Sequence, residues 1–268
     1  MRRPAASASD GVSPDPAAFQ ATLRQVAPLL LAVTFLIVGH GLQGTLPGLR
    51  GGLEGMNARS IGLIMSAYFA GFIIASFHCV RLIEALGHIR TFAALASVTS
   101  AVALAYVLQI SVTGWLILRV INGLCFAGMI LVVESWLNAG TNSRWRGRVL
   151  AVYGSITLAA WAASQPLLSL ADPSGFILFC LVSVVVSLAL VPVTLARTSV
   201  SPDVGADRLS AKRLFDASPI GVIGTFLIGV WASAFWGMGP TYGQMSGLDT
   251  GANAALISAV MVGAAVGQ

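Results

Sequence analysis

The chain has 268 residues, of which 56% are hydrophobic and 9% are charged, and its mean hydropathy is +0.85. Soluble domains are about one-quarter charged, so this composition excludes a soluble domain and predicts an all-α membrane protein. The net charge of +5 does not indicate nucleic-acid binding, because the basic residues lie in short loops and form no continuous patch. The three cysteines lie in apolar runs without a CxxC pair, so we expect no disulfide, metal site or cofactor.

Apolar runs separated by short polar segments predict spans of the lipid bilayer along most of the chain. Residues 1–24 are expected to form a disordered cytoplasmic tail. A first six-helix half, residues 25–196, is expected to hold spans at about 26–46, 60–80, 91–110, 114–138, 149–170 and 175–196. A cytoplasmic linker, residues 197–218, leads into residues 219–268, with spans at about 219–240 and 252–268.

The basic residues predict the side of the membrane that each loop occupies. With a cytoplasmic N-terminus, 12 of the 15 Lys and Arg residues lie on the cytoplasmic side, where such residues are enriched. Only Arg50 and Arg59 lie outside, and Arg119 is within a span. The 12 are Arg2, Arg3, Arg24, Arg81, Arg90, Arg144, Arg146, Arg148, Arg197, Arg208, Lys212 and Arg213.

Two short segments recur at a nearly constant offset. TFLI occurs at 34–37 and again at 225–228, 191 positions later, and LIMSAYFAG at 63–71 aligns with ALISAVMVG at 255–263, 192 positions later. Parallel repeats of helical halves are one way in which transporters are built, with the substrate site near midplane between the halves. The last two spans would then begin a second six-helix half, so we expect the sequence to be a fragment whose C-terminal half is incomplete.

Two motifs resemble those of a known family. The segment VRLIEALGHIR is similar to the loop motif G-x-L-A-D-R-x-G-R-R-R, with Glu84 for its acid, Gly87 for its second glycine and Arg90 for its last basic residue. The segment RVING (119–123) resembles the R-x-x-x-G motif, whose arginine is implicated in coupling. Both motifs belong to the major facilitator superfamily, and VVES (132–135) followed by RWRGR resembles its YcaD-like bacterial branch. The resemblance implies a two-half helical bundle in the bacterial plasma (inner) membrane.

Arg119 and Glu134 are ionisable residues within one predicted span, where a charge costs at least ~2.5–3.5 kcal/mol. The spacing places them ~22 Å apart along the helix axis and ~60° apart around it, so both can face a solute pathway. We predict that Arg119 and Asn122 line this pathway; the alternative is that Arg119 snorkels to the outer interface. Two roles are open for Glu134: a protonatable carrier, or a structural ion pair with Arg144, Arg146 or Arg148.

Polar residues of the first and fifth spans are further candidates for the pathway. His40 and Gln43 lie in the first span, where His40 is either a proton relay or a partner in an ordinary interhelical hydrogen bond. Tyr153, Thr157, Trp161 and Gln165 recur every fourth residue and so share one helix face. That face either lines a cavity or, for Tyr and Trp, supplies anchors at the membrane interface.

The segment 81–90 is predicted to be a polar turn that acts as a gating loop. A salt bridge between Glu84 and Arg90 beside Gly87 would latch one conformation of the transporter, and breaking it would bias alternating access. The alternative is that both charges are ordinary solvated residues at the membrane interface.

Missing motifs exclude hydrolysis of a nucleotide in a P-loop as an energy source for transport, and they exclude two common classes of hydrolase. A P-loop requires Lys followed by Ser or Thr, whereas the one lysine, Lys212, is followed by Arg213. The sequence also lacks the H-E-x-x-H and G-x-S-x-G motifs, so we expect no enzyme. The prediction is a secondary, gradient-driven transporter of a small-molecule solute by alternating access, with protons as the candidate coupling ion. The alternative is a non-transporting truncated membrane module that binds a ligand or partner.

Overall fold

The computed structural model describes residues 16–195 and 211–267, and within these ranges the regular structure is entirely helical. The helices are α1 (Pro16–Leu53), α2 (Ala58–Leu86), α3 (His88–Leu108), α4 (Val112–Gly140), α5 (Ser143–Ser164), the 3-10 helix η1 (Gln165–Leu170), α6 (Ile177–Leu188), α7 (Leu190–Leu195), α8 (Ala211–Ala217), α9 (Pro219–Met245) and α10 (Thr250–Gly267). The expected all-α helical bundle is confirmed.

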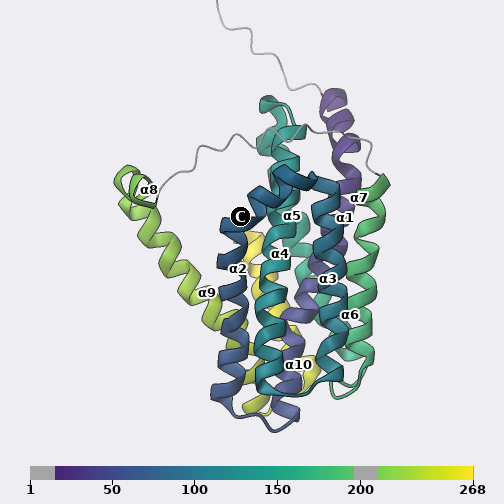
Figure 1. Cartoon of the computed structure of the whole chain (residues 1–268), viewed down its shortest axis with the longest axis vertical. Helices are drawn as coiled ribbons and strands as arrows, with labels where there is room; N and C mark the ends of the chain where they lie inside the picture. The colour runs from purple at the N-terminus through teal and green to yellow at the C-terminus, as the bar shows by residue number, and fades with distance from the viewer. Residues whose placement is uncertain (1–15, 196–210, 268) are drawn as a thin grey trace, which may run out of the picture.

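The helices pack as an elongated bundle in which α1 lies between several neighbours (Figure 1). α1 packs against α5, α6 and α9, while α2 packs along α4, and α3 packs against both α4 and α6. Leu36, Leu42 and Leu46 of α1 are fully buried in the same core as Phe92 of α3 and Phe179 of α6. This core fixes the positions of the helices that surround the polar residues of α1 and α4.

Polar side chains at the helix ends explain where several helices begin. The side-chain oxygen of Asn57 accepts from the backbone N–H of Ser60 at 2.8 Å, at the start of α2. Ser111 accepts from the N–H of Gly114 at 3.1 Å in the same way, at the start of α4. Such N-caps satisfy backbone donors that have no partner within the helix. Short capped connections therefore separate long apolar helices.

The structure corrects the prediction of a disordered tail over residues 1–24. α1 begins at Pro16, so residues 16–24 are helical. Proline suits the first position of a helix, and the following alanines favour helix formation. The ring of Phe19 packs 5.4 Å from that of Trp145 on α5, which holds this extension against the bundle. Residues 1–15 lie outside the described part of the chain.

Two predicted polar connections are also largely helical. The segment 81–90 is not a turn, because α2 ends at Leu86 and α3 begins at His88. Gly87 alone connects them with φ of 80°, a backbone conformation that glycine adopts without steric cost. The arginine-rich segment 140–148, between the spans expected at about 114–138 and 149–170, is mostly the first turns of α5, which begins at Ser143.

The predicted linker at 197–218 is helical where the structure describes it. Residues 211–217 form the short helix α8, and residues 196–210 lie outside the described part. α9 then begins at Pro219, where the Ser218 hydroxyl accepts from the N–H of Gly221 at 3.3 Å. A capping serine followed by proline at the first helical position explains why α8 and α9 are separate helices.

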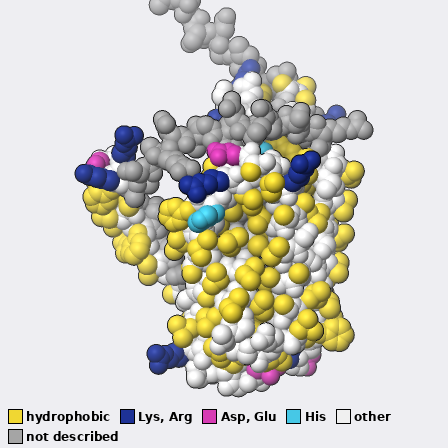
Figure 2. Space-filling view, viewed as in Figure 1, with side chains coloured by type: hydrophobic (Ala, Val, Ile, Leu, Met, Phe, Trp, Pro, Cys, Tyr) yellow, Lys and Arg dark blue, Asp and Glu magenta, His cyan; other side chains and the backbone are white. Residues whose placement is uncertain are grey.

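Five described segments are long and apolar enough to cross a bilayer: α1, α2, α3, α4 and the joined α6 and α7 (Ile177–Leu195). α9 and α10 contain shorter apolar stretches, Pro219–Trp231 and Thr250–Ala264. α5, where a span was expected at about 149–170, is not among the five, because arginines occupy its first turns. Figure 2 shows hydrophobic side chains across the middle of the molecule, with Lys and Arg near its two ends.

Candidate functional site

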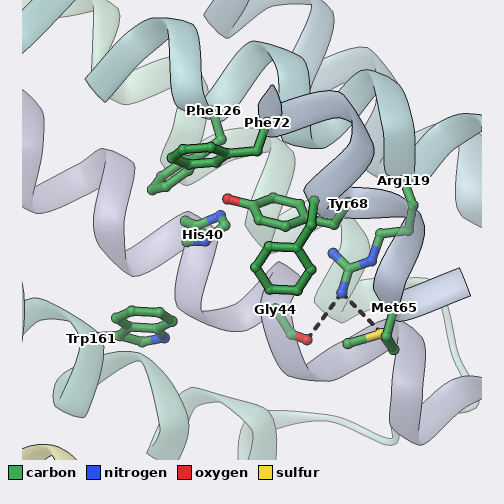
Figure 3. Close-up of a pocket in the computed structure, with 9 residues that line it drawn as sticks. His40, Gly44, Met65, Tyr68, Phe72, Arg119, Phe126 and Trp161 are labelled. Atoms are coloured by element: carbon green, nitrogen blue, oxygen red, sulfur yellow. Dashed lines mark hydrogen bonds between the residues drawn. The ribbon is translucent and has the colours of Figure 1, made fainter. Parts of the chain in front are cut away.

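A cavity of about 260 Å³ opens between α1, α2, α4 and α5. It combines aromatic rings with one cation (Figure 3). The residues that line it are His40, Gly44, Met65, Tyr68, Phe69, Phe72, Arg119, Phe126 and Trp161. In the close-up, Arg119 and Trp161 lie at opposite sides, with His40 and Tyr68 between them. Of the predicted pathway residues, His40, Arg119 and Trp161 therefore meet around one cavity.

Two glycines allow the α2 and α4 backbones to approach closely beside this cavity. A Cβ added at Gly71 of α2 would collide with the backbone carbonyl of Val120 on α4. Reciprocally, a Cβ at Gly123 of α4 would collide with the carbonyl of Tyr68 on α2. Small residues at such crossings permit backbone contact between membrane helices. Gly123 is the glycine of the RVING segment, so the motif has a packing role that also brings Arg119 next to Tyr68.

The side chain of Arg119 is only 2% exposed, so the predicted alternative of snorkelling to the interface is wrong. Its guanidinium donates to the backbone carbonyl of Gln43 at 3.1 Å, to that of Gly44 at 3.2 Å and to the sulfur of Met65 at 3.0 Å. Its Nε–H is buried without a hydrogen-bond partner. Among the described residues no carboxylate forms an ion pair with it. The cation is thus held by neutral groups inside the bundle.

Asn122 lies one turn beyond Arg119 and connects α4 to α1. Its side-chain amide donates to the side-chain oxygen of Gln43 at 2.8 Å, and both residues are almost completely buried. The same Gln43 supplies a backbone carbonyl to Arg119. The second amide atoms of the pair, Gln43 Nε2 and Asn122 Oδ1, are buried without partners. The side-chain pair joins α4 to α1 one turn from Arg119, and neither Gln43 nor Asn122 lines the cavity.

The walls of the cavity are stacked or tilted aromatic rings. The imidazole of His40 stacks on the ring of Phe126, with centroids 3.4 Å apart and an interplanar angle of 12°. Tyr68 and Trp161 lie tilted at 5.6 Å and 5.7 Å from the same imidazole. The guanidinium carbon of Arg119 lies 5.7 Å from the Tyr68 ring centroid. A planar solute can therefore contact aromatic rings from four helices.

Glu134 lies further along α4, outside the residues that line this cavity. The hydroxyl of Tyr153 on α5 donates to its carboxylate at 3.2 Å. The ion pair with Arg144, Arg146 or Arg148, one of the two predicted roles, is not formed. Those arginines instead lie at the start of α5, where Arg144 and Arg148 stack on the Trp145 ring at 5.1 Å and 5.2 Å. Glu134 and Tyr153 form a pair separate from the Arg119 cavity.

The predicted polar face of α5 is divided among three environments. Trp161 lines the cavity, whereas Tyr153 contacts Glu134. Gln165 begins η1 and is completely buried. Its amide donates to the carbonyl of Gly41 at 3.3 Å and accepts from the Thr45 hydroxyl at 3.1 Å, so it binds α1. Equal spacing along the helix did not bring these side chains to one site, since η1 replaces the regular α-helix at Gln165.

The predicted latch between Glu84 and Arg90 is not closed. Glu84 lies near the end of α2 and Arg90 in the first turn of α3, and neither forms an ion pair within the described residues. An ion pair joins Arg50 and Glu54, at 2.6 Å, near the opposite end of α1. Arg50 also donates to the carbonyls of Pro173 and Gly175, at 3.4 Å and 3.3 Å.

This opposite end is where the last two long helices meet the rest of the bundle. A Cβ added at Gly48 of α1 would lie 3.0 Å from the Thr241 hydroxyl of α9, and one at Gly62 of α2 would lie 3.5 Å from the Met238 sulfur. By contrast, Figure 1 shows α9 diverging from α2 toward α8. Ile220 and Phe226 in that part of α9 are 86% and 69% exposed. The helices are thus close at one end and apart at the other.

Sequence reasoning missed most of the cavity wall. Met65, Tyr68, Phe69 and Phe72 come from α2, and Phe126 from α4. Met65, Tyr68 and Phe72 recur at intervals of three and four residues, which places them on one helix face. In a membrane helix, an aromatic face of this kind is indistinguishable by sequence from one that faces lipid. The signal that identifies it is Gly71 within the same helix, because the close crossing turns this face toward α4.

Comparisons with known proteins agree with this architecture. The sequence model of the Major Facilitator Superfamily matches residues 20–268. The fold is similar to that in "Crystal structure of nucleoside transporter NupG", with a TM-score of 0.58 at 11% sequence identity. The similarity covers 76% of this chain and 53% of that one, so the chain spans about half the length of the solved structure. No curated protein matches in sequence. Because the family model covers most of its length, the chain belongs to the Major Facilitator Superfamily.

Proposed function

We propose that the chain contributes the solute site of a secondary active transporter, which moves a small molecule across the membrane by alternating access. The observation that carries this proposal is the cavity beside Arg119. A buried guanidinium that pairs with no carboxylate of the described chain is costly inside a membrane bundle, and such residues mark substrate or ion pathways. The cavity is lined by aromatic side chains around a small number of polar groups, as is usual for small-molecule sites.

The arrangement of α9 supports the alternating-access mechanism. α9 contacts α1 and α2 near Gly48 and Gly62, and diverges from the bundle toward its other end. Transporters built from parallel repeats expose a central site to each side in turn by rocking one half against the other. In this proposal the described arrangement is one such state, closed at the end that holds Arg50. The loops at that end face outward in the orientation that the basic residues favour, with the N-terminus in the cytoplasm.

Several finer features belong to the same proposal. The protein is a bacterial inner-membrane protein of the YcaD-like branch, and protons are its coupling ion. The pathway is completed by a second six-helix half, of which α9 and α10 are the first two helices. The pair formed by Glu134 and Tyr153 supports the choice of protons, because it places within the bundle a carboxylate that forms no ion pair with another described residue. The latch role of Glu84, Gly87 and Arg90 belongs to another state of the cycle.

The test is solute accumulation by proteoliposomes that contain the complete gene product, with an imposed proton gradient and a panel of radiolabelled small molecules. Arg119→Gln should abolish accumulation of whichever solute is transported. Arg59→Gln, a matched change at an exposed arginine near the start of α2, should leave it intact. Retained accumulation in Arg119→Gln would exclude this cavity as the solute site. Saturable binding with no flux under any gradient would favour a non-transporting membrane module.

A further inference from the structure

We infer that the cavity beside Arg119 binds a small planar aromatic anion, such as an aromatic carboxylate. This inference rests on the proposed function, because it names the substrate class of the same site. It depends on two independent properties of the described cavity: a buried cation with unused donor capacity, and walls made of aromatic rings.

The charge argument begins with the hydrogen bonds of Arg119. A guanidinium has five N–H donors, and the three acceptors here are two backbone carbonyls and the sulfur of Met65. A thioether sulfur is a weak acceptor, and the Nε–H has no partner. Arginine binds a carboxylate through two parallel N–H···O bonds, which are stronger than bonds to neutral acceptors. A carboxylate that replaces the Met65 contact would therefore supply both the missing charge and the better acceptor.

The shape argument concerns the groups next to the guanidinium. Apart from Arg119, the residues that line the cavity are six residues with rings, Met65 and Gly44. Tyr68 lies between Arg119 and His40 in Figure 3, so a ligand that reaches the guanidinium also contacts ring faces. Aromatic pairs gain free energy beyond that of the area they bury, when they stack with an offset or meet edge to face. At about 260 Å³ the cavity is below the usual range for drug-sized ligands, which favours a ligand of one or two rings.

Gly44 provides a substitution that tests the cavity without removing Arg119. It lines the cavity, and a Cβ added there would meet no atom within 4 Å. Gly44→Val therefore fills part of the cavity while the backbone carbonyl that binds Arg119 remains. Gly229 on α9 is a matched control, because a Cβ there also meets no atom and the residue does not line the cavity. Both variants add the same side chain to a membrane helix at an open position.

The experiment measures binding of radiolabelled benzoate to the full chain in lipid nanodiscs, with three unlabelled competitors. Cyclohexanecarboxylate keeps the charge without the aromatic ring, benzamide keeps the ring without the charge, and uridine is a neutral nucleoside. We expect unlabelled benzoate to displace the radiolabelled benzoate. Each of the three competitors should need at least a tenfold higher concentration than unlabelled benzoate for the same displacement. Gly44→Val and Arg119→Gln should each weaken benzoate binding at least tenfold, whereas Gly229→Val should not change it.

Different outcomes overturn different claims. Equal competition by benzamide would remove the anion requirement, and equal competition by cyclohexanecarboxylate would remove the aromatic one. Unchanged binding in Gly44→Val would place benzoate outside this cavity, and that result stands even if Arg119→Gln fails to fold. If benzoate does not bind while another solute accumulates in proteoliposomes of the complete gene product, the substrate class is wrong and the transport proposal survives. If benzoate binds with this selectivity but no solute accumulates, the substrate class survives and transport is excluded.

Discussion

The side-chain amide of Asn122 on α4 donates to the side-chain oxygen of Gln43 on α1, at 2.8 Å and at full burial. Gln43 in turn offers its backbone carbonyl to Arg119, so a single residue of α1 binds two consecutive turns of α4. Because the pair is buried, neither amide can replace a lost partner by water, and each amide retains one buried atom without a partner. The contact between α1 and α4 therefore depends on this pair.

Asn122→Ala should destabilise the protein by about 1 kcal/mol, because it leaves the Gln43 oxygen buried without a donor. The measurement is reversible unfolding in mixed micelles. Asn138→Ala is the control, since Asn138 is exposed and donates only within α4, to the carbonyl of Glu134. Adding Gln43→Ala to Asn122→Ala should cost less than the sum of the two single changes. Strict additivity in this double-mutant cycle would show that the pair contributes no coupling.

Gly71→Ala should lower the melting temperature, because the added methyl group collides with the Val120 carbonyl of α4. Overpacking of this kind costs about 1–3 kcal/mol. Gly154→Ala on α5 adds the same methyl group where no atom lies within 4 Å of it. Alanine is the better helix former, so this control should be neutral or slightly stabilising. Equal stability of Gly71→Ala and Gly154→Ala would contradict the contact between the α2 and α4 backbones.

Arg50→Gln should loosen the loop between η1 and α6, because Arg50 donates to the carbonyls of Pro173 and Gly175. Amide hydrogen exchange of residues 172–176 should become faster, while Arg59→Gln should leave it unchanged.

In the same loop, the Asp172 carboxylate accepts from the Ser174 N–H, a bond that lowers the pKa of Asp172. Because this pKa is lowered, the contribution of Asp172 is present at neutral pH and lost only as the pH falls through the lowered value.

Glu134→Gln should uncouple transport from protons if Glu134 is the proton carrier. Solute exchange between two equal pools should continue, because the Arg119 cavity is unchanged, whereas accumulation driven by a proton gradient should stop. Tyr153→Phe removes the hydroxyl that donates to Glu134 but keeps the carboxylate. This variant should therefore retain accumulation driven by a proton gradient. Gradient-driven accumulation in Glu134→Gln equal to that of the unmodified protein would assign proton coupling elsewhere.

Cysteine labelling in intact cells tests the predicted orientation. In a background with Cys79, Cys125 and Cys180 replaced by alanine, a cysteine at the exposed position 59 should react with a membrane-impermeant maleimide. A cysteine at the exposed position 147, at the start of α5, should react only after the cells are opened. The reverse pattern would place the N-terminus outside and contradict the distribution of basic residues.

The sequence was sufficient to predict an all-helical membrane bundle, because apolar runs of span length have few other stable structures. It was less informative about helix ends. Arg144, Arg146 and Arg148 resemble a loop by composition, yet Asn142 caps a helix that contains them all. Phe19 looked like part of a tail, because its contact with Trp145 joins residues that are far apart in the chain.

The residues of the candidate site were also predictable only in part. A charge within a span is conspicuous, so Arg119 could be selected from its cost alone, whereas Asn122, predicted beside it, does not line the cavity. Tyr68 and Phe72 could not, because aromatic side chains face lipid as readily as they face a cavity. Gln165 shows the opposite error: its spacing from Trp161 suggested one shared face, but its hydrogen bonds to α1 hold it away from the cavity.

The close crossing at Gly71 and Gly123 has a mechanical consequence. Two helices in backbone contact have little room to slide past each other, so we expect α2 and α4 to move together. Tyr68 and Arg119, one from each helix, would then keep their separation throughout a transport cycle. His40 and Trp161 come from α1 and α5, which do not share this crossing. A change in the width of the cavity would then come from movement of α5, which carries Trp161, because Gln43 also ties α1 to α4.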